Sequence, residues 1–178
     1  MKRGKTRGLA RLIRHFGRRE EGATAVEFAL VAGPFFALLL VIFETAVVLF
    51  TDISLQNGVT AASRLIRTGQ AQNMSLDSFR SAVCKNVFSY IDCSKIRLDV
   101  SKSATQPPAG VDMDTVNDST PQSWQKSDPS DWVLVQARYD WKLFIPALSR
   151  LSNYSNGEGE QMRRLTAGAL FRNEPFGG

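Results

Sequence analysis

The chain has 178 residues, enough for one modest domain and a membrane anchor, and 43% of them are hydrophobic. The formal net charge is +5, but residues 1–22 alone contribute +6, whereas residues 51–178 carry fourteen basic and thirteen acidic residues. The larger part of the chain is therefore nearly neutral. This argues against a nucleic-acid partner, because proteins that bind nucleic acid usually carry a basic face on the folded domain itself.

The first 22 residues form a basic leader. Eight basic residues precede the apolar segment that follows: Lys2, Arg3, Lys5, Arg7, Arg11, Arg14, Arg18 and Arg19. Basic residues that flank a membrane span remain on the cytoplasmic side. We therefore expect residues 1–22 to be a cytoplasmic leader and residues 51–178 to be exported.

An apolar segment follows the leader, and its core, FALVAGPFFALLLVIF (28–43), contains no charged residue. A helix from Ala23 to Glu44 is roughly 31 Å long, close to the hydrocarbon thickness of about 30 Å. These lengths predict a transmembrane helix over residues 23–50. Glu44 is expected near the outer interface, as a carboxylate facing water or lipid headgroups.

Two other interpretations of the N-terminus are a cleaved secretory signal and a mitochondrial presequence. The apolar segment exceeds the usual 7–15 residues of a secretory signal, and no convincing A-x-A site follows it. Apolar residues recur at helical spacing among the arginines of the leader, as in a presequence, but residues 1–22 contain no Ser. A mitochondrial inner-membrane protein therefore stays an alternative.

The junction between leader and apolar segment reads Gly22-Ala-Thr-Ala-Val-Glu-Phe28. It resembles the processing site of type IV pilin-like precursors, in which a prepilin peptidase cuts after the glycine. The resemblance implies that Ala23 becomes the new N-terminus and that Glu27, followed by Phe28, pairs with the N-terminus of a neighbouring subunit and sets its register. The alternative is that Glu27, only about 6 Å along the helix from Ala23, reaches back to the cytoplasmic interface.

Residues 22–34, GATAVEFALVAGP, resemble the opening of TadE-like proteins, the minor pseudopilins of the tight-adherence (Flp) pilus system. The closing residues 169–176, ALFRNEPF, are similar to the end of the same family, and the sibling TadF-like group shares the leader. The resemblance implies a protein of the bacterial inner membrane with a periplasmic C-terminal domain. Its implied partners are inner-membrane lipid, the prepilin peptidase, other pilin and pseudopilin subunits, and the pilus assembly machinery.

The exported part, residues 51–178, predicts an α+β domain of pilin-like design. Apolar spacing indicates that the first helix continues over 51–68 to a stop at Gly69, and that a second helix covers 75–90. Period-two alternation predicts about three antiparallel strands with one covered face, for which helix 51–68 is the natural cover. The alternating apolar residues lie in 96–100, 133–141 and 165–171.

Residues 101–131 are rich in Ser, Thr, Asp, Gln and Pro and predict a long polar loop. Trp124 in this loop is expected to anchor it, with contact to a partner as the alternative.

The two cysteines, Cys84 and Cys93, lie nine residues apart across the end of the second predicted helix. An exported domain is in an oxidising compartment, so we expect a disulfide, with two free thiols as the alternative. Two sulfurs alone make a poor metal site, and no metal is expected.

The sequence argues against catalysis. Its one histidine, His15, lies in the leader, so no Ser-His-Asp or Cys-His arrangement can form in the exported part. No HExxH, P-loop or GxGxxG motif is present, and no cofactor is expected. An anchored periplasmic enzyme or binding protein is the alternative of another class.

Overall fold

The computed structural model describes residues 23–116, 119–156 and 158–175. The chain divides into two units, Met1–Phe43 and Glu44–Gly178. The predicted leader, with Gly22, lies outside the described residues.

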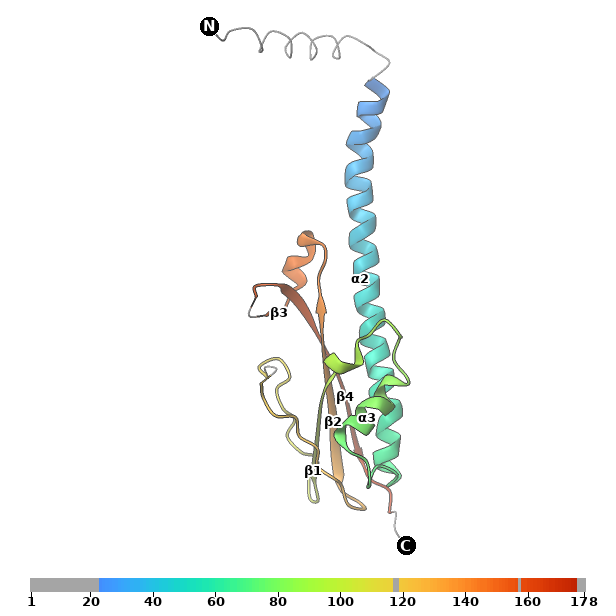
Figure 1. Cartoon of the computed structure of the whole chain (residues 1–178), viewed down its shortest axis with the longest axis vertical. Coiled ribbons are helices and arrows are strands. Elements are labelled where there is room, and N and C mark those ends of the chain that lie inside the picture. Colours follow the sequence, from blue (N-terminus) through green and yellow to red (C-terminus); the bar gives the residue numbers. More distant parts are fainter. Residues whose placement is uncertain (1–22, 117–118, 157, 176–178) are drawn as a thin grey trace. The chain divides into compact units, whose positions relative to one another are not determined.

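The longest element is helix α2, Ala23–Arg67, which contains the whole apolar segment (Figure 1). It ends where the sequence predicts. Gly69 follows it with a φ of 77° and donates its N–H to the carbonyl of Ile66 over 3.0 Å. A positive φ favours glycine, which explains why this residue stops the helix.

Four antiparallel strands form one sheet in the order β1-β2-β4-β3. Their bounds are β1 Arg97–Ser103, β2 Trp132–Lys142, β3 Tyr154–Ser155 and β4 Gln161–Arg172. The α+β class and the three longer strands are confirmed. The fourth strand, β3, was missed because two residues are too few to show alternation.

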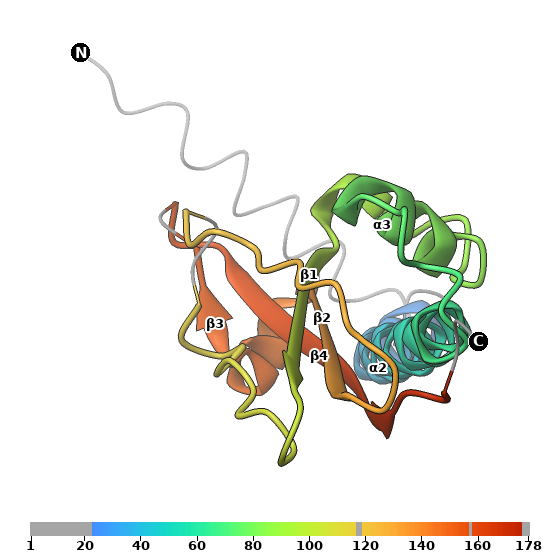
Figure 2. The same ribbon diagram turned by 90° about the horizontal axis from the view of Figure 1, so that it is seen from below.

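One face of the sheet is covered by α2 and by helix α3, Leu76–Cys84 (Figure 2). The hydrophobic core lies between these helices and the sheet and contains apolar residues from both. Helix α2 contributes Leu55, Val59, Ala62 and Ile66. These residues recur at the three-to-four spacing that turns one side of a helix towards a sheet. The expectation that residues 51–68 cover the sheet is thereby confirmed.

Helix α3 begins as predicted but ends at Cys84, six residues before the predicted end. Ser75 caps its start by accepting the N–H of Ser78. At the other end, the Phe88 N–H donates to Oγ of Ser54 on α2 over 2.9 Å and so is not available to continue the helix. The helical hydrogen bonding has already stopped at Asn86, whose N–H donates to the Val83 carbonyl over 3.1 Å and whose side-chain amide donates to the Ala82 carbonyl over 3.4 Å.

The two helices approach closely at Gly58 of α2. A Cβ atom on this residue would lie 2.7 Å from Cγ1 of Val87 and 2.9 Å from the carbonyl oxygen of Val83. Neither distance is compatible with a side chain, so the absence of one lets α3 lie against α2.

The second face of the sheet is also covered in part, contrary to the expectation of one covered face, although Leu170 on this face is 51% exposed. The segment after β1 passes over it (Figure 2). Gln136 of β2 exchanges two hydrogen bonds with the backbone of Val111, of 2.8 and 2.9 Å. Met113 and Val116 of this segment are buried. Alternation along the strands identified the polar face correctly but could not show that a distant loop folds over it.

Residues 122–125 of the predicted loop lie along the outer edge of β1. The Val100 N–H donates to the Ser123 carbonyl over 2.9 Å, and the Gln125 N–H donates to the Val100 carbonyl over 3.1 Å. Oε1 of Gln122 accepts from the N–H of Leu98 at 3.0 Å. The expected role of Trp124 as an anchor is confirmed, because its ring packs 5.1 Å from Phe79.

Amide side chains occupy part of the opposite edge, on β4. Gln56 of α2 exchanges two hydrogen bonds with the backbone of Gly168, of 3.0 and 3.2 Å. Oδ1 of Asn153 accepts the N–H of Arg164 at 2.7 Å. Both edges of the sheet therefore carry side-chain amides that imitate a neighbouring strand.

The expected disulfide joins Cys84 at the end of α3 to Cys93 in the short 3-10 helix η2, Cys93–Lys95. The two Cα atoms are 6.0 Å apart. The bond ties α3 to the start of β1.

Candidate functional site

The predicted site residues Glu27 and Phe28 lie in the first turns of α2. Both side chains are exposed, and Phe28 has 72% of its surface exposed. Ala23 is the first residue of the helix, but Gly22 lies outside the described part of the chain. The geometry thus places Glu27 on a helix surface from which another molecule can reach it.

The apolar segment that follows Glu27 is exposed along its length. Exposed large side chains between Phe28 and Phe43 are Phe28, Leu30, Val31, Phe35, Phe36, Leu38, Leu40, Ile42 and Phe43. Among the described residues, one helix, α2, is long and apolar enough to cross a membrane. A core helix of a soluble protein would be buried, whereas this segment has no cover of its own. The segment anchors the chain in a membrane.

Glu44 is buried, with 8% of its surface exposed, which corrects the expectation of a solvated carboxylate. Its Oε1 accepts the N–H of Phe144 at 2.6 Å, and its Oε2 accepts the N–H of Ile145 at 2.9 Å. These amides precede the 3-10 helix η3, Pro146–Leu151. A carboxylate between two amide donors is well satisfied, and such charge-assisted bonds are the strong ones.

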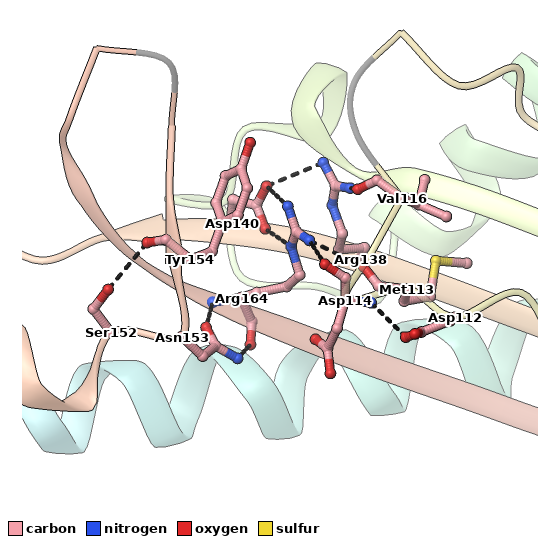
Figure 3. Close-up of polar contacts among 10 residues, drawn as sticks. All are labelled: Asp112, Met113, Asp114, Val116, Arg138, Asp140, Ser152, Asn153, Tyr154 and Arg164. Carbon is pink, nitrogen blue, oxygen red and sulfur yellow. Dashed lines mark hydrogen bonds and ion pairs between the residues drawn. The ribbon is translucent and has the colours of Figure 1, made fainter.

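A second buried polar group lies on the loop-covered face of the sheet, where Asp140 of β2 faces two arginines (Figure 3). Nε of Arg164 is 2.9 Å from one carboxylate oxygen of Asp140, and Nη2 of Arg138 is 3.1 Å from the other. The two guanidinium side chains are 1% and 3% exposed. Asp140 and Arg164 are direct cross-strand partners, so the sheet register brings them together.

One carboxylate cannot satisfy two buried guanidinium groups, and backbone carbonyls supply the rest. Nη1 of Arg164 donates to the carbonyls of Met113 and Asp114, and Nη1 of Arg138 donates to the carbonyl of Val116 (Figure 3). The ring of Tyr154 lies under the Arg164 guanidinium, 3.8 Å from it. The cluster thus fixes the segment that covers the sheet, which is a structural role.

Asp99 of β1 lies on the same face, almost fully buried. Burial raises the pKa of its carboxyl above the ordinary value, against the opposing effects of the hydrogen bond from the Ser123 N–H and of nearby Arg97. Its Oδ1 atom has no hydrogen-bond partner among the described residues.

An open hollow of about 890 Å³ lies beside this cluster. Its lining mixes charges of both signs with aromatic rings, including Lys95, Asp140, Lys142, Tyr154 and Glu160. Across the described ranges, no three His, Cys, Asp or Glu side chains are grouped to hold a metal ion. Among its lining residues, the Ser94 hydroxyl donates to Oδ1 of Asp92 over 2.7 Å, a contact at the start of η2, where Asp92 is the N-cap.

The sequence reasoning missed both buried clusters. Arg138 and Asp140 alternate with the apolar residues of 133–141 and so fall on the face that was expected to be uncovered, and Glu44 was expected near the outer interface. In the sequence, the only sign of the Asp140 cluster is a row of charged residues on one face of the strand. The long loop that covers this face could not be placed from the sequence.

Taken together, these features define a class: a membrane-anchored α+β protein in which an exposed apolar helix continues into a small domain with a four-stranded antiparallel sheet. Residues 22–64 match the family model described as TadE-like protein, so this segment is similar to that family. Neither a curated protein nor a solved structure matches the chain significantly.

The match confirms the resemblance stated for residues 22–34 and extends it to the part of α2 that covers the sheet. The similarity of residues 169–176 to the end of the family lies outside the matched segment and stays a prediction.

Proposed function

We propose that the chain is a single-pass, pseudopilin-like protein that acts structurally in assembly of the tight-adherence (Flp) pilus, a type IV-like system. The observation that carries the proposal is the order of features at the N-terminus. A basic leader ends in Gly22, and an exposed apolar helix follows with Glu27 at its fifth position. The family match over residues 22–64 supports the same system.

The proposed topology follows from charge and length. The leader lies in the cytoplasm, residues 23–50 cross the bacterial inner membrane, and residues 51–178 are periplasmic. The Cys84–Cys93 disulfide supports this placement of the domain, because disulfides persist in oxidising compartments.

Glu27 gives the proposal its physical mechanism. A carboxylate within an apolar helix costs several kcal/mol unless it is paired or reaches an interface. Cleavage after Gly22 creates an ammonium group at Ala23, and the same group on a neighbouring subunit is a partner of opposite charge. Partners therefore include the prepilin peptidase, which makes the cut, and other pilin or pseudopilin subunits.

Processing is the first test. When the chain is produced together with its prepilin peptidase, N-terminal sequencing of the membrane fraction should read ATAVEF, from Ala23. A Gly22→Leu variant is the matched control and should retain Met1 and the leader. An uncut wild-type chain, or a cut at another position, would contradict the processing claim.

The second test concerns Glu27 itself. Glu27→Ala should leave membrane insertion intact, as measured by resistance to alkaline extraction. It should reduce the number of pili by about tenfold or more, as expected when the association constant of a subunit contact falls tenfold, which corresponds to about 1.4 kcal/mol. Glu27→Gln, which keeps the size and removes the charge, should behave like Glu27→Ala. Normal piliation in both variants would mean that Glu27 only reaches back to the membrane surface.

A further inference from the structure

The nine residues Leu143–Leu151, between β2 and β3, form an apolar loop that contains η3. Its sequence is LFIPALSRL, in which only Ser149 and Arg150 are polar. Phe144 has 71% of its surface exposed and Leu151 has 49%. Apolar side chains that gather on an exposed loop usually mark a surface that another apolar phase covers.

Glu44 fixes the position of this loop along α2. Its two carboxylate oxygens hold the N–H groups of Phe144 and Ile145 at 2.6 and 2.9 Å. Glu44 is also the first charged residue after the charge-free run 28–43. The loop is therefore tied to the residue at which the hydrocarbon layer is expected to end.

The surroundings of the loop have the composition of a lipid contact. A hollow of about 340 Å³ lies between α2 and the loop, and its walls include Val48 and Leu49 on one side and Leu148 and Leu151 on the other. Arg163 also lines it and donates to the Leu151 carbonyl over 3.1 Å. The lining also has polar members, Asp52 and Arg164 among them, while its leucines and Arg163 suit an acyl chain and the phosphate to which it is attached.

The ring of Phe144 packs against an aromatic neighbour, Trp141. The ring of Trp141 meets it edge to face, with the centroids 6.3 Å apart. Aromatic side chains gather at membrane interfaces because their rings tolerate the boundary between headgroups and hydrocarbon.

We propose that the 143–151 loop rests on the bilayer, with Phe144 and Leu151 among the first acyl carbons and Arg150 and Arg163 at lipid phosphates. The hydrogen bonds from the Phe144 and Ile145 amides to Glu44 hold the loop beside the end of the membrane-spanning segment. The loop then gives the Glu44–Gly178 unit a contact with the membrane of its own. The proposal rests on the membrane anchor and is independent of any role in pilus assembly.

The test uses the full chain in nanodiscs of phosphatidylcholine and phosphatidylglycerol, labelled with an environment-sensitive fluorophore at one introduced cysteine while the native disulfide is kept oxidised. Ser149→Cys places the label in the loop, because Ser149 is exposed there. Ala109→Cys is the matched control in an exposed segment of the domain, and Leu38→Cys reports insertion of the apolar segment.

A nitroxide on the lipid near its headgroup should quench the label at residue 149 several-fold more than the label at residue 109. Iodide in the water should show the reverse order. Equal iodide quenching at 149 and 109 would overturn the proposal, as would protection of residue 149 from both quenchers, which would indicate a protein partner. Absence of lipid quenching at residue 38 would overturn it together with the anchor.

Two variants separate the loop from general effects on folding. Phe144→Ser combined with Leu151→Ser should lower lipid quenching at residue 149 several-fold, whereas Phe88→Ser, at another exposed Phe, should not. Equal quenching in all three chains would contradict the assignment of these side chains to lipid. Because these measurements need neither the peptidase nor pili, their failure is distinguishable from failure of the proposed function.

Discussion

Replacement of Asp140 by Asn is expected to lower the free energy of unfolding of the Glu44–Gly178 unit by about 3–5 kcal/mol, the usual cost of breaking a buried ion pair. Asp140 bonds to both Arg138 and Arg164, whose side chains are 3% and 1% exposed. The variant leaves two buried positive charges with an amide in place of the carboxylate. Loss of a charged acceptor at a buried guanidinium group is costly because the low-polarity interior cannot replace that acceptor with hydration.

The measurement is urea denaturation of the full chain in detergent micelles, followed by tryptophan fluorescence. All three tryptophans, Trp124, Trp132 and Trp141, lie in this unit. Asp114→Asn is the matched control. Asp114 is exposed and contributes its backbone carbonyl to Arg164, which the substitution keeps. The control should change the free energy of unfolding by less than about 0.5 kcal/mol. Equal stabilities of the two variants would contradict the role given to Asp140.

Replacement of Phe79 by Ala is expected to cost about 3–5 kcal/mol, the range for truncating a buried Phe. Phe79 is fully buried between α3 and the sheet and packs on Trp124. Its removal leaves a cavity and also weakens the contact that holds residues 122–125 along β1. The loss in unfolding free energy should be larger than the free energy of transferring the ring from the core to water.

Far-UV circular dichroism during urea denaturation measures this change without depending on Trp124. Phe88→Ala is the matched control, since Phe88 is 51% exposed and lies outside the core. It should cost less than about 1 kcal/mol. A similar loss in both variants would mean that Phe79 has no special part in holding the edge segment.

The elements that the sequence predicted are those whose signal is local. The apolar run of α2, the stop at Gly69 and the alternation in β1, β2 and β4 each depend on residues close together in the chain. The disulfide was also predictable, because the sequence has two cysteines, nine residues apart, and these can form one pair within the chain. The predicted end of α3 was wrong, because the apolar spacing continues beyond Cys84, where the helical hydrogen bonds stop.

The features that escaped prediction are contacts across long stretches of sequence. Glu44 and Phe144 are 100 residues apart, and the groups that Glu44 binds are backbone amides, which every residue but proline offers. Arg164 and the Asp114 carbonyl are 50 residues apart. A polar strand face looks the same in sequence whether water or a loop covers it. Only the three-dimensional path of residues 104–131 decides between the two.

The amide side chains along the sheet edges have a consequence for self-association. An open strand edge is a template on which another chain can add a strand, and many fibres grow in that way. Here Gln122 and Gln125 occupy the β1 edge, while Gln56 and Asn153 occupy positions on the β4 edge. Hydrogen-bonding groups that a foreign strand would need are thus already in use. Copies of this chain that meet in a membrane should therefore associate through side-chain surfaces, reversibly and in a defined geometry, and resist conversion to cross-β aggregates.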